Sequence, residues 1–468
     1  MPPAKSFTAR VPAFPGTIAL ILVVIACLFL LPLANRAHDA ALIPTLEAMP
    51  DGDLPDWFSR VAAAGTAASR QGGMRFDLSF DLAPDDGHAD NLPLAGPASL
   101  TGDLAFTADG YSLSSVVVKL GDMEISGDIA VSLAGVRPAL TASLHSGRLD
   151  LSGFFPEDEA EERPAEKVFS AEPLPFELLK TLDADLSYTA DGVIFPGVIF
   201  DDLRFTAKVV DGRLEIETLS AIVANGQLVM SGGILAGQEV PQVIVDLEVR
   251  GLEPGLLPDF REINATEGSL TDIRFNAEGF GRSVAAIMGS LNGSLLAVTG
   301  EGKHLVKQID QLGSDFVLQA LNLINPFRKT VNETQIMCVV IRFDIRDGVA
   351  TSDQGLAAQT QQLNILGGGV IDLKTEQLDI VFHPEARSGI SLSKISLVEL
   401  VHIYGTLANL EVREDTQNAL LRGIGTASTS LITGGVAYLV RSLFPGGFSK
   451  KDPCKVALRE DESPPDMP

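Results

Sequence analysis

The feature that most constrains the fold of this chain is a two-residue alternation of apolar and polar side chains, clearest within 167–233. In 182–189 (LDADLSYT) and 203–208 (LRFTAK), every second residue is apolar and the residues between them are polar or charged. A β-strand turns successive side chains to opposite faces, whereas an amphipathic helix would repeat every three or four residues. The Asp-Gly pairs at 191–192 and 211–212 predict turns. The pattern therefore predicts an antiparallel sheet with one apolar and one polar face.

The same alternation extends over much of the chain, including 129–133, 140–144, 243–249, 273–277 and 341–345. The stretches DLAFTADG (103–110) and DLSYTADG (185–192) differ at two positions, which suggests that one β unit is used twice. We therefore expect a fold that is mainly β with a few helices.

An uncharged apolar run, 17–34, precedes this β region and is long enough to span a bilayer. Lys5 and Arg10 lie before the run, so the positive-inside rule predicts a cytoplasmic amino terminus and an exported body. The alternative is a lipoprotein cleavage box ending at Cys27. Residues 28–33 would then leave an apolar stretch after the modified cysteine, which favours an uncleaved inner-membrane anchor.

The remaining boundaries follow from changes in periodicity and composition. In chain order we expect a cytoplasmic amino terminus (1–16), a transmembrane anchor (17–34), a helical stem (35–72), a first β segment (73–155), an acidic linker (156–178), a second β segment (179–302), an amphipathic helix (303–328), a C-terminal β module (329–415), a C-terminal helix (416–444) and a disordered tail (445–468).

The charge balance and the motifs exclude several classes of function. With 35 Lys and Arg against 61 Asp and Glu, the net charge is −26, which argues against a nucleic-acid partner. The six histidines show no metal-ligand spacing, and HExxH, GxSxG, paired CxxC and P-loop motifs are missing from the sequence. We therefore expect neither an enzyme nor a bound metal or cofactor.

Two cysteines, Cys338 and Cys454, lie outside the predicted anchor. In an oxidising compartment they could form a disulfide. The alternative is two unrelated thiols, one of them on a buried strand. The residues alone leave both possibilities open.

Several long segments, in order, resemble the AsmA family of bacterial envelope proteins. They are VFSAEPLPFELLKTLDADL (168–186), ANG (224–226), LNLINPFRK (321–329), CVVIRFDIRDGVA (338–350), GGGVIDLKTEQLDI (367–380), GTLANLEVRED (405–415) and PCKVAL (453–458). The resemblance implies a single-pass inner-membrane protein whose periplasmic body is an elongated, groove-forming β structure. It also implies phospholipid or another envelope lipid as a partner, with outer-membrane assembly factors as further partners.

The apolar strand face then has two interpretations. Taken alone, the pattern favours an ordinary core, whereas the resemblance favours a surface on which acyl chains lie. The alternative function is a non-catalytic envelope scaffold that regulates the targeting or assembly of outer-membrane proteins through protein contacts. The candidates for lipid contact are the inward-facing Leu186, Leu203, Phe205, Val245 and Phe275.

Overall fold

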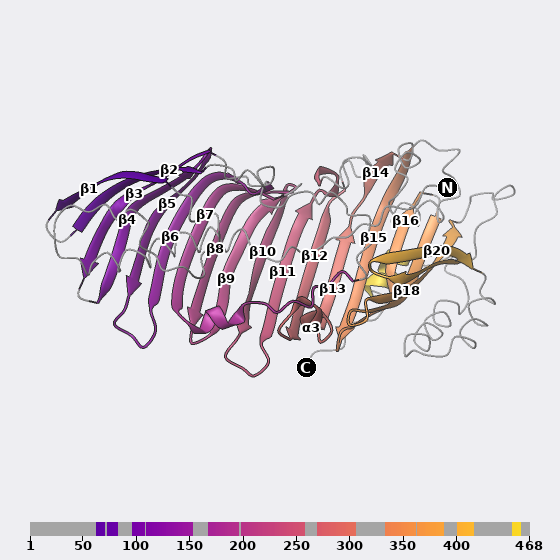
Figure 1. The fold of residues 1–468 in the computed structure, drawn as a ribbon. Helices are drawn as coiled ribbons and strands as arrows, with labels where there is room; N and C mark the ends of the chain where they lie inside the picture. The colour runs from indigo at the N-terminus through magenta and orange to yellow at the C-terminus, as the bar shows by residue number, and fades with distance from the viewer. Residues whose placement is uncertain are drawn as a thin grey trace, which may run out of the picture. The chain divides into compact units, whose positions relative to one another are not determined.

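The structure is a computed structural model that describes residues 62–70, 73–82, 96–107, 109–152, 167–195, 198–257, 269–305, 333–361, 363–387, 400–415 and 452–459. Most of these residues form β-strands, as the alternation predicts (Figure 1). They divide into two compact units. The N-terminal unit holds the described residues up to 152 together with Asp183–Arg204, and the C-terminal unit holds 167–182 and those from Phe205 onward.

The N-terminal unit is a sheet in which each strand up to β6 pairs antiparallel with the next one in the chain. Its strands are β1 (Ala62–Arg70), β2 (Gly73–Leu82), β3 (Gly96–Thr107), β4 (Gly110–Leu120), β5 (Met123–Ser132), β6 (Ala139–Asp150) and β7 (Asp183–Phe195), followed by residues 198–204 of β8 (Val198–Val210).

The pair β6–β7 is parallel, which is an exception to the predicted antiparallel pairing. Parallel neighbours need a long connection that returns the chain to the same end of the sheet. The connection here runs from 151 to 182. The turn predicted at 191–192 is also wrong, because β7 continues to Phe195 and Gly192 pairs with Arg148 of β6.

The C-terminal unit is a second sheet with a few short helices. Its elements are η5 (Phe176–Lys180), residues 205–210 of β8, β9 (Arg213–Val223), β10 (Gly226–Leu235), β11 (Gln242–Leu252), η6 (Pro254–Leu256), β12 (Thr271–Phe280), α3 (Val284–Met288), β13 (Asn292–Thr299), β14 (Gly302–Leu305), β15 (Glu333–Arg346), β16 (Val349–Thr360), β17 (Leu363–Asp372), β18 (Gln377–Ala386), β19 (Leu400–Thr406), β20 (Asn409–Asp415) and α7 (Pro453–Leu458). From β9 to β20 every described pair is antiparallel, and β13 and β14 both pair with β15.

Two Asp-Gly turns of this unit have the backbone that hairpins favour. Asp211 and Gly212 have φ of 53° and 74°, and Asp347 and Gly348 have φ of 48° and 76°. Positive φ at both central residues matches the right-handed twist of the flanking strands. The turn predicted at 211–212 is confirmed, and 347–348 forms a second turn of the same kind.

Three predicted segments need correction. The helical stem at 35–72 is wrong over Ala62–Arg70, where β1 pairs with β2, because pairing outweighs the weak helical spacing of small residues. The amphipathic helix at 303–328 is wrong at its start, since β14 extends to Leu305. The disordered tail at 445–468 is wrong over Pro453–Leu458, which form α7. The rest of these segments, including the helix at 416–444, lies outside the described residues.

The described helices are all too short or too polar to cross a bilayer. The predicted anchor at 17–34 lies outside the described residues.

Candidate functional site

The sheet register of the C-terminal unit aligns apolar side chains in rows that cross the strands. Three rows lie on one face: Ala221, Leu228, Val249, Ile273, Ala297 and Ile341; Leu219, Met230, Leu247, Phe275, Leu295 and Phe343; and Ile216, Gly232, Val245, Ala277, Gly293 and Ile345. We call this surface the apolar face. Directly opposed residues on neighbouring strands lie about 4.5–5.5 Å apart, so the side chains of the first two rows form continuous strips of hydrocarbon, whereas Gly232 and Gly293 interrupt the third.

The apolar face is only partly covered over β9–β13. Leu219, Met230, Leu247, Phe275 and Leu295 of the middle row are all half-buried, whereas Phe343 at the end of that row is 7% exposed. The three rows contain no charged side chain. The surface is therefore suited to uncharged hydrocarbon.

The opposite surface of the same strands, the polar face, carries charged residues. The Glu248 carboxylate lies 2.8 Å from Nη2 of Arg250 and 3.3 Å from Nε of Arg274. The hydrogen bond from Arg250 is the main reason that the pKa of Glu248 lies below its usual value. The two faces thus differ as the sequence alternation predicts.

The apolar face becomes a closed core at the β15–β20 end. Figure 1 shows β18 and β20 running across the direction of β15 and β16, so the sheet rolls over. Ile365, Val401 and Ile403 form a buried cluster in which Val401 is completely covered. Close packing here uses Gly367, where a Cβ atom would lie 2.5 Å from the Phe382 ring.

The N-terminal unit repeats the arrangement on a smaller scale. One row of its sheet consists of Leu104, Leu113, Ile129, Ala142 and Leu186. All five belong to one hydrophobic cluster, in which Leu186 is only partly buried. The next rows bring in two tyrosines, Tyr111 and Tyr188. Burial raises the pKa of both hydroxyls, although a hydrogen bond to Ser146 (2.7 Å) opposes this at Tyr188.

The five lipid-contact candidates separate between the units. Leu186 and Leu203 lie in the N-terminal unit, where Leu203 packs beside a cluster that includes Leu149 and Val193. Phe205, Val245 and Phe275 lie in the C-terminal unit. Val245 and Phe275 occupy adjacent rows of the apolar face, and all five candidates are half-buried. Their contact with lipid stays a prediction.

A second feature, absent from the sequence-based prediction, is a segment that crosses the ends of several strands. We call 167–181 the strap. The Glu376 carboxylate accepts hydrogen bonds from the backbone N–H groups of Val168 (2.6 Å) and Phe169 (3.1 Å). Further along, the Leu174 N–H donates to the Arg282 carbonyl at 2.7 Å. The predicted acidic linker at 156–178 is therefore wrong from 167 onward, since this part is docked on the C-terminal unit.

The strap also adds to the core. Phe169 packs against the cluster that contains Phe343, together with Phe275 and Leu295 of the apolar face. Glu376 itself is 2% exposed. A buried carboxylate is stable only where its oxygens accept hydrogen bonds, and here two amide groups supply them.

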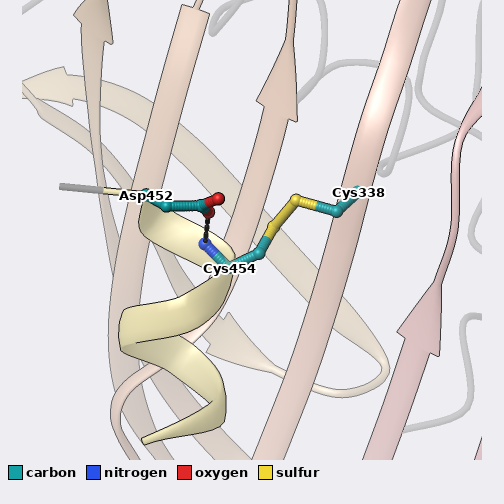
Figure 2. Close-up of side chains that lie close together, drawn as sticks. All are labelled: Cys338, Asp452 and Cys454. Atoms are coloured by element: carbon teal, nitrogen blue, oxygen red, sulfur yellow. Dashed lines mark hydrogen bonds between the residues drawn. A yellow bond between two sulfur atoms is a disulfide. The ribbon is translucent and has the colours of Figure 1, made fainter. Parts of the chain in front are cut away.

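The third feature is the bond that joins Cys338 and Cys454. Figure 2 shows the disulfide between β15 and α7, with Cα atoms 6.5 Å apart. Of the two possibilities that the sequence leaves open, the structure has the disulfide. Two thiolates and a carboxylate are common zinc ligands, and Asp452 lies beside the sulfurs, but the sulfurs are bonded to each other here.

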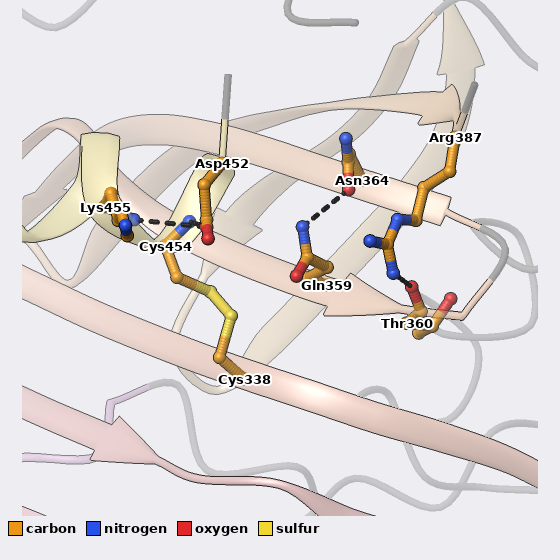
Figure 3. Close-up of a disulfide and its surroundings, with 8 residues drawn as sticks. All are labelled: Cys338, Gln359, Thr360, Asn364, Arg387, Asp452, Cys454 and Lys455. Carbon is orange, nitrogen blue, oxygen red and sulfur yellow. Dashed lines mark hydrogen bonds between the residues drawn. A yellow bond between two sulfur atoms is a disulfide. The ribbon is translucent and has the colours of Figure 1, made fainter. Parts of the chain in front are cut away.

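Helix α7 packs on the polar face through its own apolar residues. Cys454 and Ala457 contact Val340, Ala357 and Leu366 of β15–β17. Figure 3 shows two hydrogen bonds near this site, from Gln359 to Asn364 (3.0 Å) and from Arg387 to the Thr360 carbonyl (3.0 Å). The docking of α7 on β15–β17 could not be found from local sequence pattern, since Cys338 and Cys454 are 116 positions apart.

A His–Asp pair lies on β18 and β19, on the side opposite the apolar core. Nε2 of His402 lies 2.6 Å from Asp379, and the His402 and Tyr404 rings are 4.9 Å apart. Ile380 packs in the apolar core, so its neighbour Val381 lies on the other side of the sheet. Val381 pairs with His402, which places His402 on that side too. The pair satisfies a buried imidazole, which is the common structural use of such a contact.

Comparisons with known proteins agree with the resemblance seen in the sequence. The model of the AsmA family matches residues 117–354, slightly more than half of the chain. AsmA family protein YhjG from Escherichia coli (strain K12) is 24% identical over 371 residues, which cover 73% of this chain and 52% of that protein. The chain thus spans about half the length of this curated relative. No solved structure matches this chain. The extent of the family match shows that the chain belongs to the AsmA family.

Proposed function

We propose that this protein binds and transfers phospholipid on the apolar face of its β structure, as an anchored protein of the bacterial envelope. The anchor is 17–34, the amino terminus is cytoplasmic, and the body lies in the periplasm. Membership of a family of envelope proteins supports this location. The ligand lies with its acyl chains along the rows and its headgroup in water.

The observation that carries the proposal is the register of the C-terminal unit. Apolar residues from five strands, β9–β13, meet in uncharged rows, and the five residues of the middle row on these strands stay half-buried, although a core would cover them. Burial of hydrocarbon contributes about 0.8 kcal/mol per methylene group. A few methylenes in contact with one row would therefore hold an acyl chain reversibly.

Two adjacent residues of β11 give a matched test. Val245 lies on the apolar face, and Ile244 lies on the polar face with 40% exposure. The photo-crosslinking residue p-benzoylphenylalanine is placed at each position in the full chain, and the cells are irradiated. Mass spectrometry should find a phospholipid adduct at 245 and little at 244.

A pair of charge substitutions completes the experiment. Val245→Asp should lower the phospholipid that copurifies with the chain several-fold, because a carboxylate in the row must be desolvated when the acyl chain binds. Ile244→Asp should leave it unchanged. Equal crosslinking at the two positions, or no lipid at either in a folded chain, would show that the apolar face is not the binding surface.

A further inference from the structure

Helix α7 covers an apolar patch on the polar face, and we call this patch the α7 seat. It consists of Val340, Ala357 and Leu366, which are 1%, 4% and 1% exposed, with Leu296 and Val298 at its margin. The surrounding polar face is charged, for example at Arg342 and Asp344. The seat is therefore a second apolar surface, and α7 keeps it out of water.

Among the described residues, the helix has few attachments to the sheet besides the disulfide. It has six residues, far fewer than an isolated helix needs for stability. Apart from the packing on the seat, an exposed ion pair links Arg459 to Asp344 at 3.4 Å. Exposed pairs of this kind contribute little. The Cys338–Cys454 bond is the strong attachment.

The carboxylate of Asp452 is fixed next to that bond. It accepts hydrogen bonds from the N–H groups of Cys454 (3.0 Å) and Lys455 (3.3 Å), which makes Asp452 the N-cap of α7. A carboxylate oxygen and the two sulfurs lie within 4.8 Å of one another (Figure 2). The negative charge therefore stands beside both atoms at which reduction takes place.

Reduction of the disulfide by a dithiol has two displacement steps. A thiolate of the reductant forms a bond to one protein sulfur, and the other protein sulfur leaves with the electron pair of the broken bond. The second reductant thiol, as a thiolate, then displaces the first protein sulfur and closes an oxidised reductant. Both protein sulfurs finally take up protons from the reductant thiols, through water.

The burial of the two sulfurs decides the course of the first step. Cys338 is half-buried and Cys454 is 5% exposed, so attack is easier at Cys338 and the leaving group is Cys454. A leaving thiolate at Cys454 would form in a buried place beside the Asp452 carboxylate. Burial and a like charge both disfavour an anion.

We infer that Asp452 protects the Cys338–Cys454 bond from thiol reductants, and so keeps α7 on its seat. The residue has two separable actions. It caps α7, which needs only an oxygen acceptor, and it disfavours a leaving thiolate at the disulfide, which needs a negative charge; we call the second action the shield. Asn and Ser are also good N-caps but are neutral.

The test compares Asp452→Asn and Asp452→Ser with Asp344→Asn in the full chain, purified oxidised in mild detergent. Asp344→Asn removes the ion pair at the other end of α7 and leaves the charge at the disulfide intact. Samples are exposed to dithiothreitol for set times, alkylated and weighed by mass spectrometry. Both Asp452 variants should be reduced roughly three- to tenfold faster than wild type, since a leaving thiol of lower basicity departs faster.

The Asp344→Asn chain should be reduced at the wild-type rate. Added salt should lessen the difference in reduction rate between wild type and Asp452→Asn, because it screens the charge. Hydrogen exchange of the oxidised chains distinguishes an effect of the lost charge from a loosening of α7. If the α7 amides exchange at the wild-type rate in Asp452→Asn while its reduction is faster, the shield is confirmed. Wild-type reduction rates in both Asp452 variants, or faster exchange of α7 before reduction, would overturn the inference.

Discussion

Glu376 shows how one buried carboxylate can hold a distant segment in place. Its two oxygens accept hydrogen bonds from the N–H groups of Val168 and Phe169, so this contact holds the backbone of the strap, while the Phe169 side chain packs in the core. Removal of the carboxylate would leave both part-buried N–H groups without their acceptor. The free energy of this contact is therefore best measured by removing Glu376 itself.

We predict that Glu376→Ala lowers the free energy of unfolding of the C-terminal unit by about 2–6 kcal/mol, from two unsatisfied donors at roughly 1–3 kcal/mol each. Urea unfolding of the full chain, followed by tryptic cleavage within 167–181, measures both stability and strap release. The control is Glu278→Ala, since Glu278 is exposed and bonds only to Gln242 at 2.9 Å among the contacts that the structure describes. A loss no larger than in this control would contradict the role of Glu376.

From Tyr111 and Tyr188 we predict that the stability of the N-terminal unit falls at alkaline pH. Burial raises the pKa of both hydroxyls in the folded state, so folding favours the protonated form. Their contribution to stability is complete below the ordinary tyrosine pKa of about 10 and is lost as pH rises through the folded pKa. Urea midpoints at pH 8, 10 and 11, with tyrosinate absorbance as the second signal, should fall at high pH. Replacing both residues by Phe should flatten this fall, and an equally steep fall would contradict the assignment.

At the scale of elements, β17 depends on a run of three glycines at 367–369. A Cβ at Gly367 would lie 2.5 Å from the Phe382 ring and 2.8 Å from the Val381 carbonyl, so the adjacent strand occupies the space that a side chain needs. Gly367→Ala should destabilise the unit by about 1–3 kcal/mol, measured as a shift of the urea midpoint. Gly237→Ala is the matched control, since its nearest described atom would be 3.6 Å away. Equal midpoints for the two variants would disprove the packing argument.

Local rules predicted those elements whose form depends on neighbours in sequence. Asp211-Gly212 forms the expected turn, because β8 ends at Val210 and β9 begins at Arg213. The same dipeptide at 191–192 stays within β7, where Gly192 pairs with Arg148 in the parallel register. A dipeptide cannot report a partner strand, so the parallel pair could not be foreseen.

The candidate site was predictable to a similar extent. Alternation placed Val245 and Phe275 on one face, and the register confirms that they occupy adjacent rows. Glu376 and Asp452 remained hidden because each acts through contacts with atoms far away in sequence or with the backbone of a short helix. Their sequence contexts, TEQ and DPC, are ordinary for a turn and for a helix start.

For the whole molecule, the proposed location and the disulfide must agree. Thiols stay reduced in the bacterial cytoplasm and oxidise in the periplasm. We predict that Cys338 and Cys454 are bonded in the full chain and free in a chain that lacks 17–34. Alkylation of whole cells with a mass-tagged maleimide measures this. An unrelated export signal in place of 17–34 should restore the bond, and a bond in the deletion variant without such a signal would contradict export by this segment.

The strap also has a consequence for folding during synthesis. Val168 leaves the ribosome long before the carboxylate that will hold it, because 208 positions separate the two residues. At about 5–20 residues per second, roughly 10–40 s pass before Glu376 is made. During that interval Phe169 has no completed core to pack against, and the apolar side chains of the nascent segment stay exposed. A protein of this topology therefore depends on the molecules that bind its incomplete chain during synthesis.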